Sequence, residues 1–187
     1  NGWEKNYGPI FDTISAVIEE IFQLHDMRNI FIMRHCLNFI FYFMGYVGFF
    51  FFIKTVFPNN NITIILSLFY LFHPRLFGHG FFNPKDSILQ AYVAISLIPI
   101  ARSFLYCKYK DLILSGIILG IAISTKIASI YIPLIFSACF FLFFLLKNIG
   151  LRKIIPLLFT FYFTLMVSTY IFWPPIWTNP LSSIIDV

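Results

Sequence analysis

Four stretches of the chain are long and apolar enough to cross a lipid bilayer as helices: residues 35–57, 62–81, 87–107 and 154–173. A hydrocarbon core about 30 Å thick requires about 20 apolar residues in one helical segment. The composition is 59% hydrophobic and only 11% charged, which excludes both a water-soluble domain and a disordered chain. We therefore predict an all-α fold, a polytopic helical bundle integral to a membrane.

A fifth apolar stretch, residues 112–146, is too long for one crossing and short for two. Lys126 and Pro133 interrupt it, and a proline opens a helix more readily than it continues one. We predict a tight helical hairpin that turns between these two residues. The bundle then has about six membrane segments.

The N-terminal part differs from the rest because its apolar residues alternate with polar ones at helical spacing. Apolar side chains recur from Ile10 to Phe22, with acidic and polar residues on the opposite side. This pattern predicts an interfacial amphipathic helix, with Pro9 at its first position. Residues 1–33 are thus expected to form an outer-face segment, and residues 34–187 the transmembrane bundle. No signal peptide is visible, and the chain is expected to be an N-terminally truncated fragment of a longer protein.

The basic residues divide between the two ends of the predicted bundle. Lys and Arg favour cytoplasmic loops, so we predict that the end with short basic loops is cytoplasmic. The segment 1–33, the 74–86 loop, the 126–133 turn and the C-terminal tail then lie on the extracytoplasmic face. The net charge of +5 contains no basic run, so nucleic acid is not predicted as a partner. The cytoplasmic group consists of Lys54, Arg102, Lys108, Lys110, Lys147, Arg152 and Lys153.

The three cysteines, Cys36, Cys107 and Cys139, lie singly in or beside apolar runs. We interpret them as small buried hydrophobic residues. They indicate no disulfide scaffold and no redox chemistry. Since no second carboxylate accompanies Asp86, no metal and no cofactor are predicted.

The stretch from His73 to Asp86 gathers two cations, two histidines and one acid at the outer end of a predicted span. Such a cluster is expensive inside or beside hydrocarbon, so it indicates a function. Arg75 and Lys85 near a helix N-terminus suit a phosphate. The alternative is a loop at headgroup level whose cations touch lipid phosphate.

The local backbone of this stretch is predicted to favour a ligand. Gly78 and Gly80 would let a loop bend and come close to it. Pro84 would begin the next helix, with Asp86 in the first turn.

Residues 74–86, PRLFGHGFFNPKD, closely resemble a motif at the end of the third span in bacterial membrane glycosyltransferases of family 39 type, in the GT-C superfamily. Other segments resemble further parts of that family in the same order. These are Tyr7 to Asp12 in an outer loop, Arg34 to Asn38 at a span entrance, Leu119 to Lys126 in a small-residue helix, and Trp173 to Pro180 in a tryptophan-proline turn.

The resemblance implies an inverting glycosyltransferase that takes a sugar from a polyprenyl-phosphate-linked donor, similar to mannosyl- and arabinosyltransferases. It implies a site on the extracytoplasmic face of a bacterial inner membrane, with the acceptor left open. This chemistry requires a carboxylate to take the acceptor proton and cations to stabilise the departing phosphate. The family's acidic pair is expected upstream of Asn1.

We predict that cations of this chain bind the lipid phosphate and that Asp86, in the catalytic site, organises them or the acceptor. Each candidate has a structural alternative: an interface anchor for Arg34, a helix cap for His79 and a snorkelling lysine for Lys126. The predicted substrate-binding residues are Arg34, Arg75, His79, Lys85 and Lys126.

Two tryptophans, Trp173 and Trp177, are predicted to anchor the chain at the membrane interface, with a sugar-stacking or acceptor role as the alternative. Two rival functions stay open. One is a transporter or lipid-handling protein, although transporters place polar residues at the midplane of repeated halves. The other is a non-catalytic assembly subunit.

Overall fold

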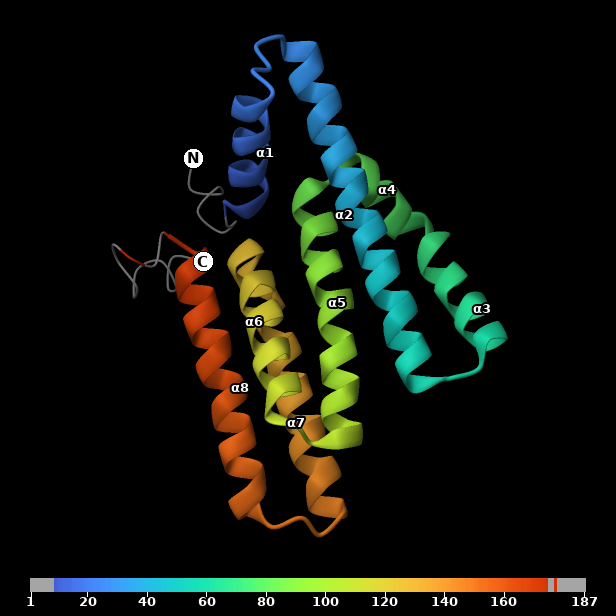
Figure 1. Ribbon diagram of the computed structural model, residues 1–187, viewed down its shortest axis with the longest axis vertical. Helices are drawn as coiled ribbons and strands as arrows, with labels where there is room; N and C mark the ends of the chain where they lie inside the picture. The colour runs from blue at the N-terminus through green and yellow to red at the C-terminus, as the bar shows by residue number, and fades with distance from the viewer. Residues whose placement is uncertain (1–8, 175–176, 178–187) are drawn as a thin grey trace.

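The computed structural model describes residues 9–174 and residue 177. No strand occurs among these residues, and helices account for nearly all of them (Figure 1). In chain order the elements are α1 (Ile10–Ile21), α2 (Met27–Val56), α3 (Asn60–Leu71), α4 (Pro74–Phe82), α5 (Pro84–Tyr106), α6 (Tyr109–Thr125), the 3₁₀ helix η2 (Ile127–Ile130), α7 (Tyr131–Leu146) and α8 (Leu151–Phe172).

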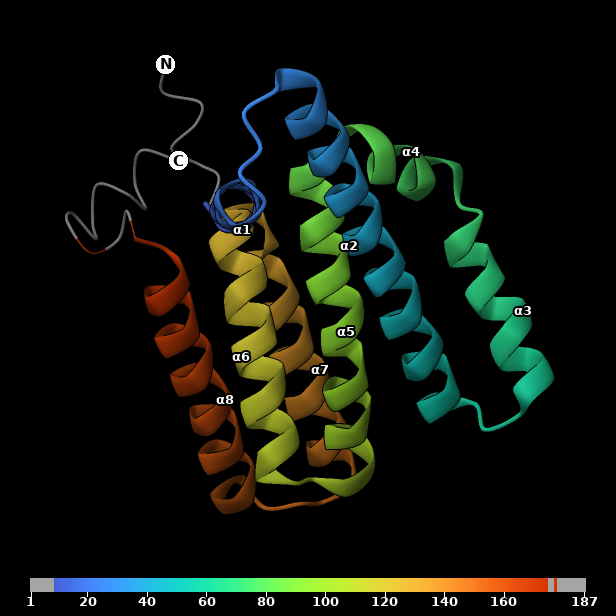
Figure 2. The same cartoon turned by 45° about the horizontal axis from the view of Figure 1, so that its top comes forward.

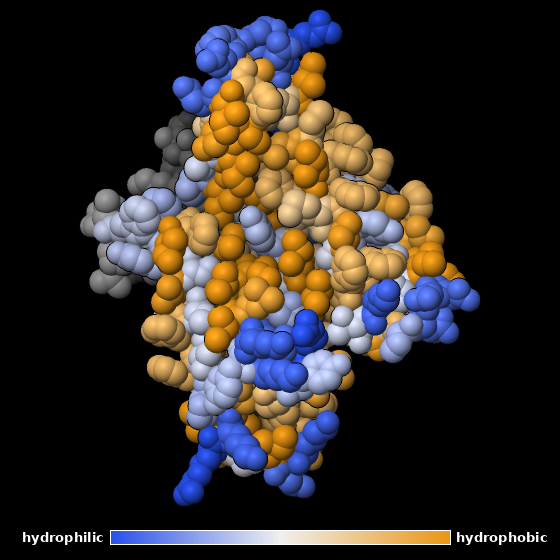
Figure 3. All heavy atoms as spheres, viewed as in Figure 1, coloured by the Kyte–Doolittle hydropathy of each residue, from blue (hydrophilic) through white to orange (hydrophobic). Residues whose placement is uncertain are grey.

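The long helices run alongside one another: α2 and α5 are parallel, and α5, α6, α7 and α8 alternate in direction (Figure 1). Four segments of the described chain are long and apolar enough to cross a membrane: α2, α5, α8, and η2 continued by α7. Orange, apolar atoms dominate the middle of the surface, and hydrophilic atoms gather at its two ends (Figure 3). This is an integral membrane protein with an all-α bundle, as the sequence predicted.

The predicted span 62–81 is wrong. The chain instead forms α3, which ends at Leu71, and the separate nine-residue helix α4. The break lies at His73, whose backbone is extended, because a residue before proline is pushed out of the helical region by the pyrrolidine ring of Pro74. Figure 2 shows α4 turned away from the direction of α3, beside the N-terminal half of α2.

The 74–86 loop is also wrong, because Gly78 and Gly80 both lie inside α4. Gly80 serves packing rather than bending: a Cβ there would lie 2.9 Å from the ring of Tyr42. The predicted start of the following helix at Pro84 is correct.

The predicted hairpin between residues 112 and 146 is confirmed. α6 ends at Thr125, Lys126 is extended, and η2 leads into α7. Pro133 lies in the first turn of α7, where its missing N–H removes no helical bond. The turn thus falls between the two residues that interrupt the apolar stretch.

Small residues let α6 lie directly against α8. A Cβ on Gly116 would come within 2.7 Å of the Phe161 carbonyl oxygen, and one on Gly120 within 2.7 Å of the Leu165 carbonyl oxygen. Buried side chains of α6, α7 and α8, including Leu119 and Phe140, form the largest core cluster. This contact fixes the position of the α6 end that carries Lys126.

The amphipathic helix predicted near the N-terminus is present as α1, although Pro9 caps it rather than opening it. Ile10 and Phe11 are buried against α2 and α5, whereas Ile21 and Phe22 are exposed. In Figure 2, α1 is viewed almost along its axis while the long helices are seen from the side. It therefore lies obliquely over the end of the bundle where α5 begins.

Two predictions about burial are wrong. Cys36 and Cys139 are exposed on the outside of the bundle and Cys107 is only half-buried, because the helix faces that carry them point away from the protein core. Trp173 has an exposed fraction of only 2% and belongs to the core cluster instead of an interfacial belt. Trp177 is exposed, with its indole N–H donating to the Tyr170 carbonyl at 2.5 Å.

Candidate functional site

The polar residues near the junction of α4 and α5 are organised by Asn83, which ends one helix and caps the next. Its side-chain oxygen accepts from the Asp86 backbone N–H at 3.2 Å. Its side-chain nitrogen donates to Asp86 Oδ2 at 2.8 Å. These reciprocal bonds resemble a capping box and hold the Asp86 carboxylate in one orientation at the positive end of the α5 dipole.

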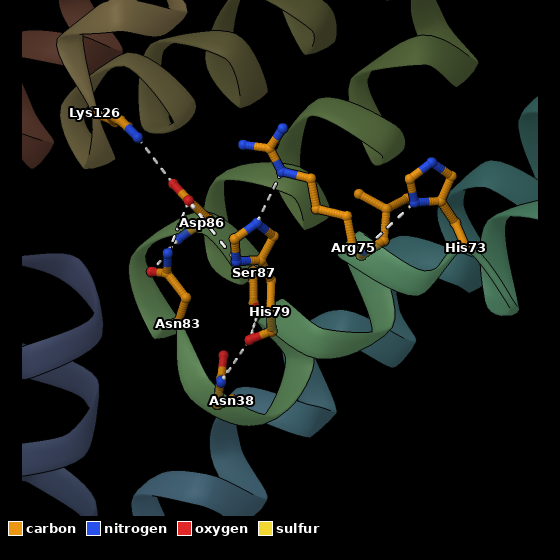
Figure 4. Close-up of polar contacts among 9 residues, drawn as sticks. Asn38, His73, Arg75, His79, Asn83, Asp86, Ser87 and Lys126 are labelled. Atoms are coloured by element: carbon orange, nitrogen blue, oxygen red, sulfur yellow. Dashed lines mark hydrogen bonds and ion pairs between the residues drawn. The ribbon is translucent and has the colours of Figure 1, made fainter.

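Lys126 reaches this carboxylate from the end of α6. Its Nζ lies 2.9 Å from Asp86 Oδ1 (Figure 4). The two side chains are 31% and 26% exposed, so the pair is open to a ligand on one side. Because Lys126 is the residue at which α6 ends and the chain becomes extended, its side chain leaves the helix surface and turns toward α5.

His79 and Arg75 extend the pair into a chain of four ionisable groups. Arg75 Nε donates to His79 Nε2 at 3.3 Å, and His79 Nδ1 lies 4.0 Å from Asp86 Oδ2. An arginine nitrogen can only donate, so Nε2 of the histidine is the acceptor and its hydrogen is carried on Nδ1, facing Asp86. Figure 4 shows the four side chains in sequence from Arg75 to Lys126.

The backbone of His79 is fixed by two further polar residues. Its carbonyl oxygen accepts from Asn38 Nδ2 at 3.0 Å and from Ser87 Oγ at 2.8 Å. Asn38 is buried in α2 and Ser87 in α5, so this one carbonyl ties three helices together. These bonds set where the histidine ring can reach.

The two other predicted site residues, Lys85 and Arg34, have different surroundings from the four groups just described. Lys85 is half-buried in the first turn of α5, next to Asp86 in sequence. Arg34 is tied to α1 instead: its Nε lies 2.8 Å from Glu19 Oε1 and its guanidinium 4.0 Å from Asp12. Arg34 thus joins α2 to α1 and does not contact the groups around Asp86.

Sequence reasoning missed Asn38, Asn83 and Ser87. Asn38 could have been singled out as an amide inside an apolar run, where an unpaired polar group is costly. Asn83 immediately before Pro84 matches a helix-capping pattern, with Asp86 three residues later. Nothing in the sequence distinguishes Ser87 from the other serines of the spans.

An apolar hollow of about 400 Å³ lies beside the end of α6 that carries Lys126. It is formed by α6, η2, α7 and α8, and its lining includes Ile123, Ile127, Pro133 and Trp173. Its lining contains Ile127, the next residue in the chain, but not Lys126 itself, whose side chain turns toward α5.

The residues described by the structure contain no cluster of histidine, cysteine and acidic side chains that could hold a metal ion. The fold and site define an integral membrane protein. At one end of its bundle, four ionisable side chains, from Arg75 to Lys126, form a partly exposed cluster. Comparison with protein-family profiles, with curated proteins and with solved structures found no match.

Proposed function

We propose that the chain is part of a GT-C glycosyltransferase of family 39 type, which transfers a sugar from a polyprenyl-phosphate-linked donor. The single observation that carries the proposal is the contact between Lys126 and Asp86. The two residues belong to the two segments, 119–126 and 74–86, whose sequences resemble that family at separate places. A ligand site requires such segments to meet.

In the proposed reaction, the bond between the sugar's anomeric carbon and the phosphate oxygen breaks while the acceptor oxygen forms a bond from the opposite face. The polyprenyl phosphate leaves with an added negative charge. Arg75, Lys85 and Lys126 supply cations near the place where that charge develops. A carboxylate takes the proton from the acceptor hydroxyl.

Asp86 serves this reaction by positioning the cations. One of its oxygens accepts from Lys126 and the other from Asn83, so neither is free of donors in the way a general base needs to be. Of the two roles predicted for Asp86, this geometry favours organising the cations.

Binding of undecaprenyl phosphate to the purified protein in detergent tests the proposal. Arg75→Gln, Lys85→Met and Lys126→Met should each weaken binding about tenfold or more, because each removes a charge-assisted bond. Lys147→Met, at the opposite end of the bundle, is the matched control. Unchanged binding in all three variants would refute the site.

Transfer itself is measured on the full-length enzyme as release of polyprenyl phosphate from a labelled donor. Lys126→Met should lower this release sharply, and Lys126→Arg should keep part of it because the charge remains. Binding of undecaprenyl phosphate with no transfer from any donor would favour the lipid-handling or assembly-subunit alternatives.

The proposed orientation places Lys126 and Asp86 on the extracytoplasmic face of the inner membrane. Residue 78 is the better labelling position on that side, because a side chain at Gly78 meets open space whereas one at Gly80 collides with Tyr42. In a variant without native cysteines, an impermeant thiol reagent added outside should modify Gly78→Cys and spare Asn60→Cys. The reverse pattern would refute the orientation.

A further inference from the structure

A second cationic cluster lies at the opposite end of the bundle, where α2 and α5 end and α6 begins. Lys54 is in the last turn of α2, Arg102 is near the end of α5, and Lys110 is at the start of α6. Figure 3 shows hydrophilic atoms over the lower ends of α5 and α6, with hydrophobic atoms above them.

Arg102 stands between two surface hollows. One, of about 390 Å³, is lined by Arg102 with Lys110 and Asp111. The other, of about 420 Å³, is lined by Arg102 with Lys54 and Thr55. The two hollows therefore share one guanidinium and carry three cations against one carboxylate.

Asp111 does not cancel the charge of this surface. It is 3% exposed and lies 3.3 Å from Arg102 Nε, while the arginine side chain is 41% exposed. The carboxylate is buried at the base of the first hollow and holds the guanidinium in place. The outer side of Arg102, together with the exposed Lys54 and Lys110, faces the surroundings.

Below the cations both hollows are apolar. Ile113, Leu114 and Ile117 follow Lys110 along α6, and Ile98 precedes Arg102 along α5. Each apolar residue lies about one to two helical turns farther into the bundle than its cation. A polar rim over an apolar wall matches a molecule that is anionic at one end and hydrocarbon at the other.

We propose that these two hollows around Arg102 form a binding site for an anionic phospholipid, with the phosphate between Arg102 and the two lysines and an acyl chain along α6. Basic pockets between membrane helices attract anionic headgroups. A free phosphate ion would use the cations alone and would leave the apolar wall without a role. The site is independent of the proposed glycosyltransferase function, because it lies at the other end of the molecule.

Binding of fluorescent phosphatidylglycerol to the purified protein in detergent, with unlabelled competitors, tests this site. Phosphatidylglycerol should compete at least about tenfold better than phosphatidylcholine, whose headgroup has no net charge, and inorganic phosphate should not compete. Equal competition by phosphatidylcholine, or displacement by inorganic phosphate, would overturn the proposal.

Variants assign the binding to these residues. Lys54→Met combined with Lys110→Met keeps the Arg102–Asp111 pair and should weaken phosphatidylglycerol binding about 25-fold, at about fivefold for each lysine. The matched control, Lys147→Met with Arg152→Gln, removes two charges from the same end without touching either hollow and should bind normally. An equal loss in the control would overturn the site. Lys126→Met should also bind normally, and a loss there would assign the lipid to the other end and overturn the proposal.

Discussion

Two ion pairs join α5 to α6, one at each end of the same antiparallel pair of helices. Asp86 and Asp111 each lie in the first turn of their own helix, and Lys126 and Arg102 lie at or near the end of the partner helix. Both arrangements agree with the helix dipoles, which favour acids at N-termini and cations at C-termini. Local electrostatics therefore does not distinguish the two pairs.

Burial distinguishes them. The difference lies in the carboxylates: Asp111 is 3% exposed although its partner Arg102 is 41% exposed, whereas both partners of the Asp86 pair are about one quarter to one third exposed. A buried carboxylate depends on its cation for stability, while a half-exposed pair can share its cation with an arriving phosphate. At the Arg102 end the buried carboxylate is a structural fastening for a cation whose outer side is exposed, whereas at the Lys126 end both partners are accessible to a ligand.

The largest expected effect follows from breaking the buried pair. Arg102→Met leaves the Asp111 carboxylate without its cation and should lower the free energy of unfolding by about 3 kcal/mol, measured by chemical denaturation in detergent. The double variant Arg102→Met with Asp111→Leu should regain most of that loss. If the double variant were as unstable as the single one, the pair would not be the cause.

A smaller effect is expected at Asn83, which caps α5 and orients Asp86. Asn83→Ala removes the cap and should cost about 1 kcal/mol in unfolding free energy. Asn83→Ser keeps a capping oxygen and should recover much of the stability while still lacking the amide bond to Asp86. A stability of Asn83→Ala equal to that of the unmodified protein would contradict the cap.

Removing the half-exposed cation should cost still less. Lys126→Met should change the unfolding free energy by about 0.5 kcal/mol, since exposed pairs contribute little. A loss as large as that of Arg102→Met would remove the contrast between the two pairs and make Lys126 primarily structural.

The smallest effect is the salt dependence of each coupling energy. Double-mutant cycles on Asp86 with Lys126 and on Asp111 with Arg102 give these energies separately. High salt should reduce the first by about 0.3 kcal/mol and the second by less, because the buried Asp111 carboxylate is screened less than the partly exposed Asp86 carboxylate. Equal salt sensitivity would show that the difference in burial has no energetic consequence.

Hydropathy and charge predicted the membrane bundle, the hairpin at Lys126 and the grouping of one set of basic residues, Lys54 and Arg102 among them, at one end of the bundle. They failed at residues 62–81. The length of this apolar stretch suggested one helix, although Pro74 disfavours a helical conformation for His73 and this could have been read from the sequence. Gly78 and Gly80 were interpreted as a flexible loop. The sequence does not reveal that the ring of Tyr42 packs against Gly80, which explains the small residue there.

The candidate site was predictable in its residues and not in its contacts. The cost of Lys126 in an apolar stretch indicated a partner, but Asp86 is 40 residues away and meets it only because α5 and α6 pack together. Arg102 was treated only as a topology charge, and Asp111 was not singled out. Their contact depends on how deeply the start of α6 is covered, which no local pattern encodes.

The length of α3 also has a consequence for the surrounding bilayer. Its 12 residues extend only about 18 Å at 1.5 Å per residue, well short of a hydrocarbon core about 30 Å thick. Exposed side chains along it, such as Ile65 and Phe69, are apolar. The polar residues Asn59 and Asn60 stand at its N-terminus. A thinner bilayer beside α3 would reduce this mismatch, which costs fractions of a kcal/mol per Å. Bilayer thickness is therefore a physical variable that acts on this side of the protein, and lipids with shorter chains match it best.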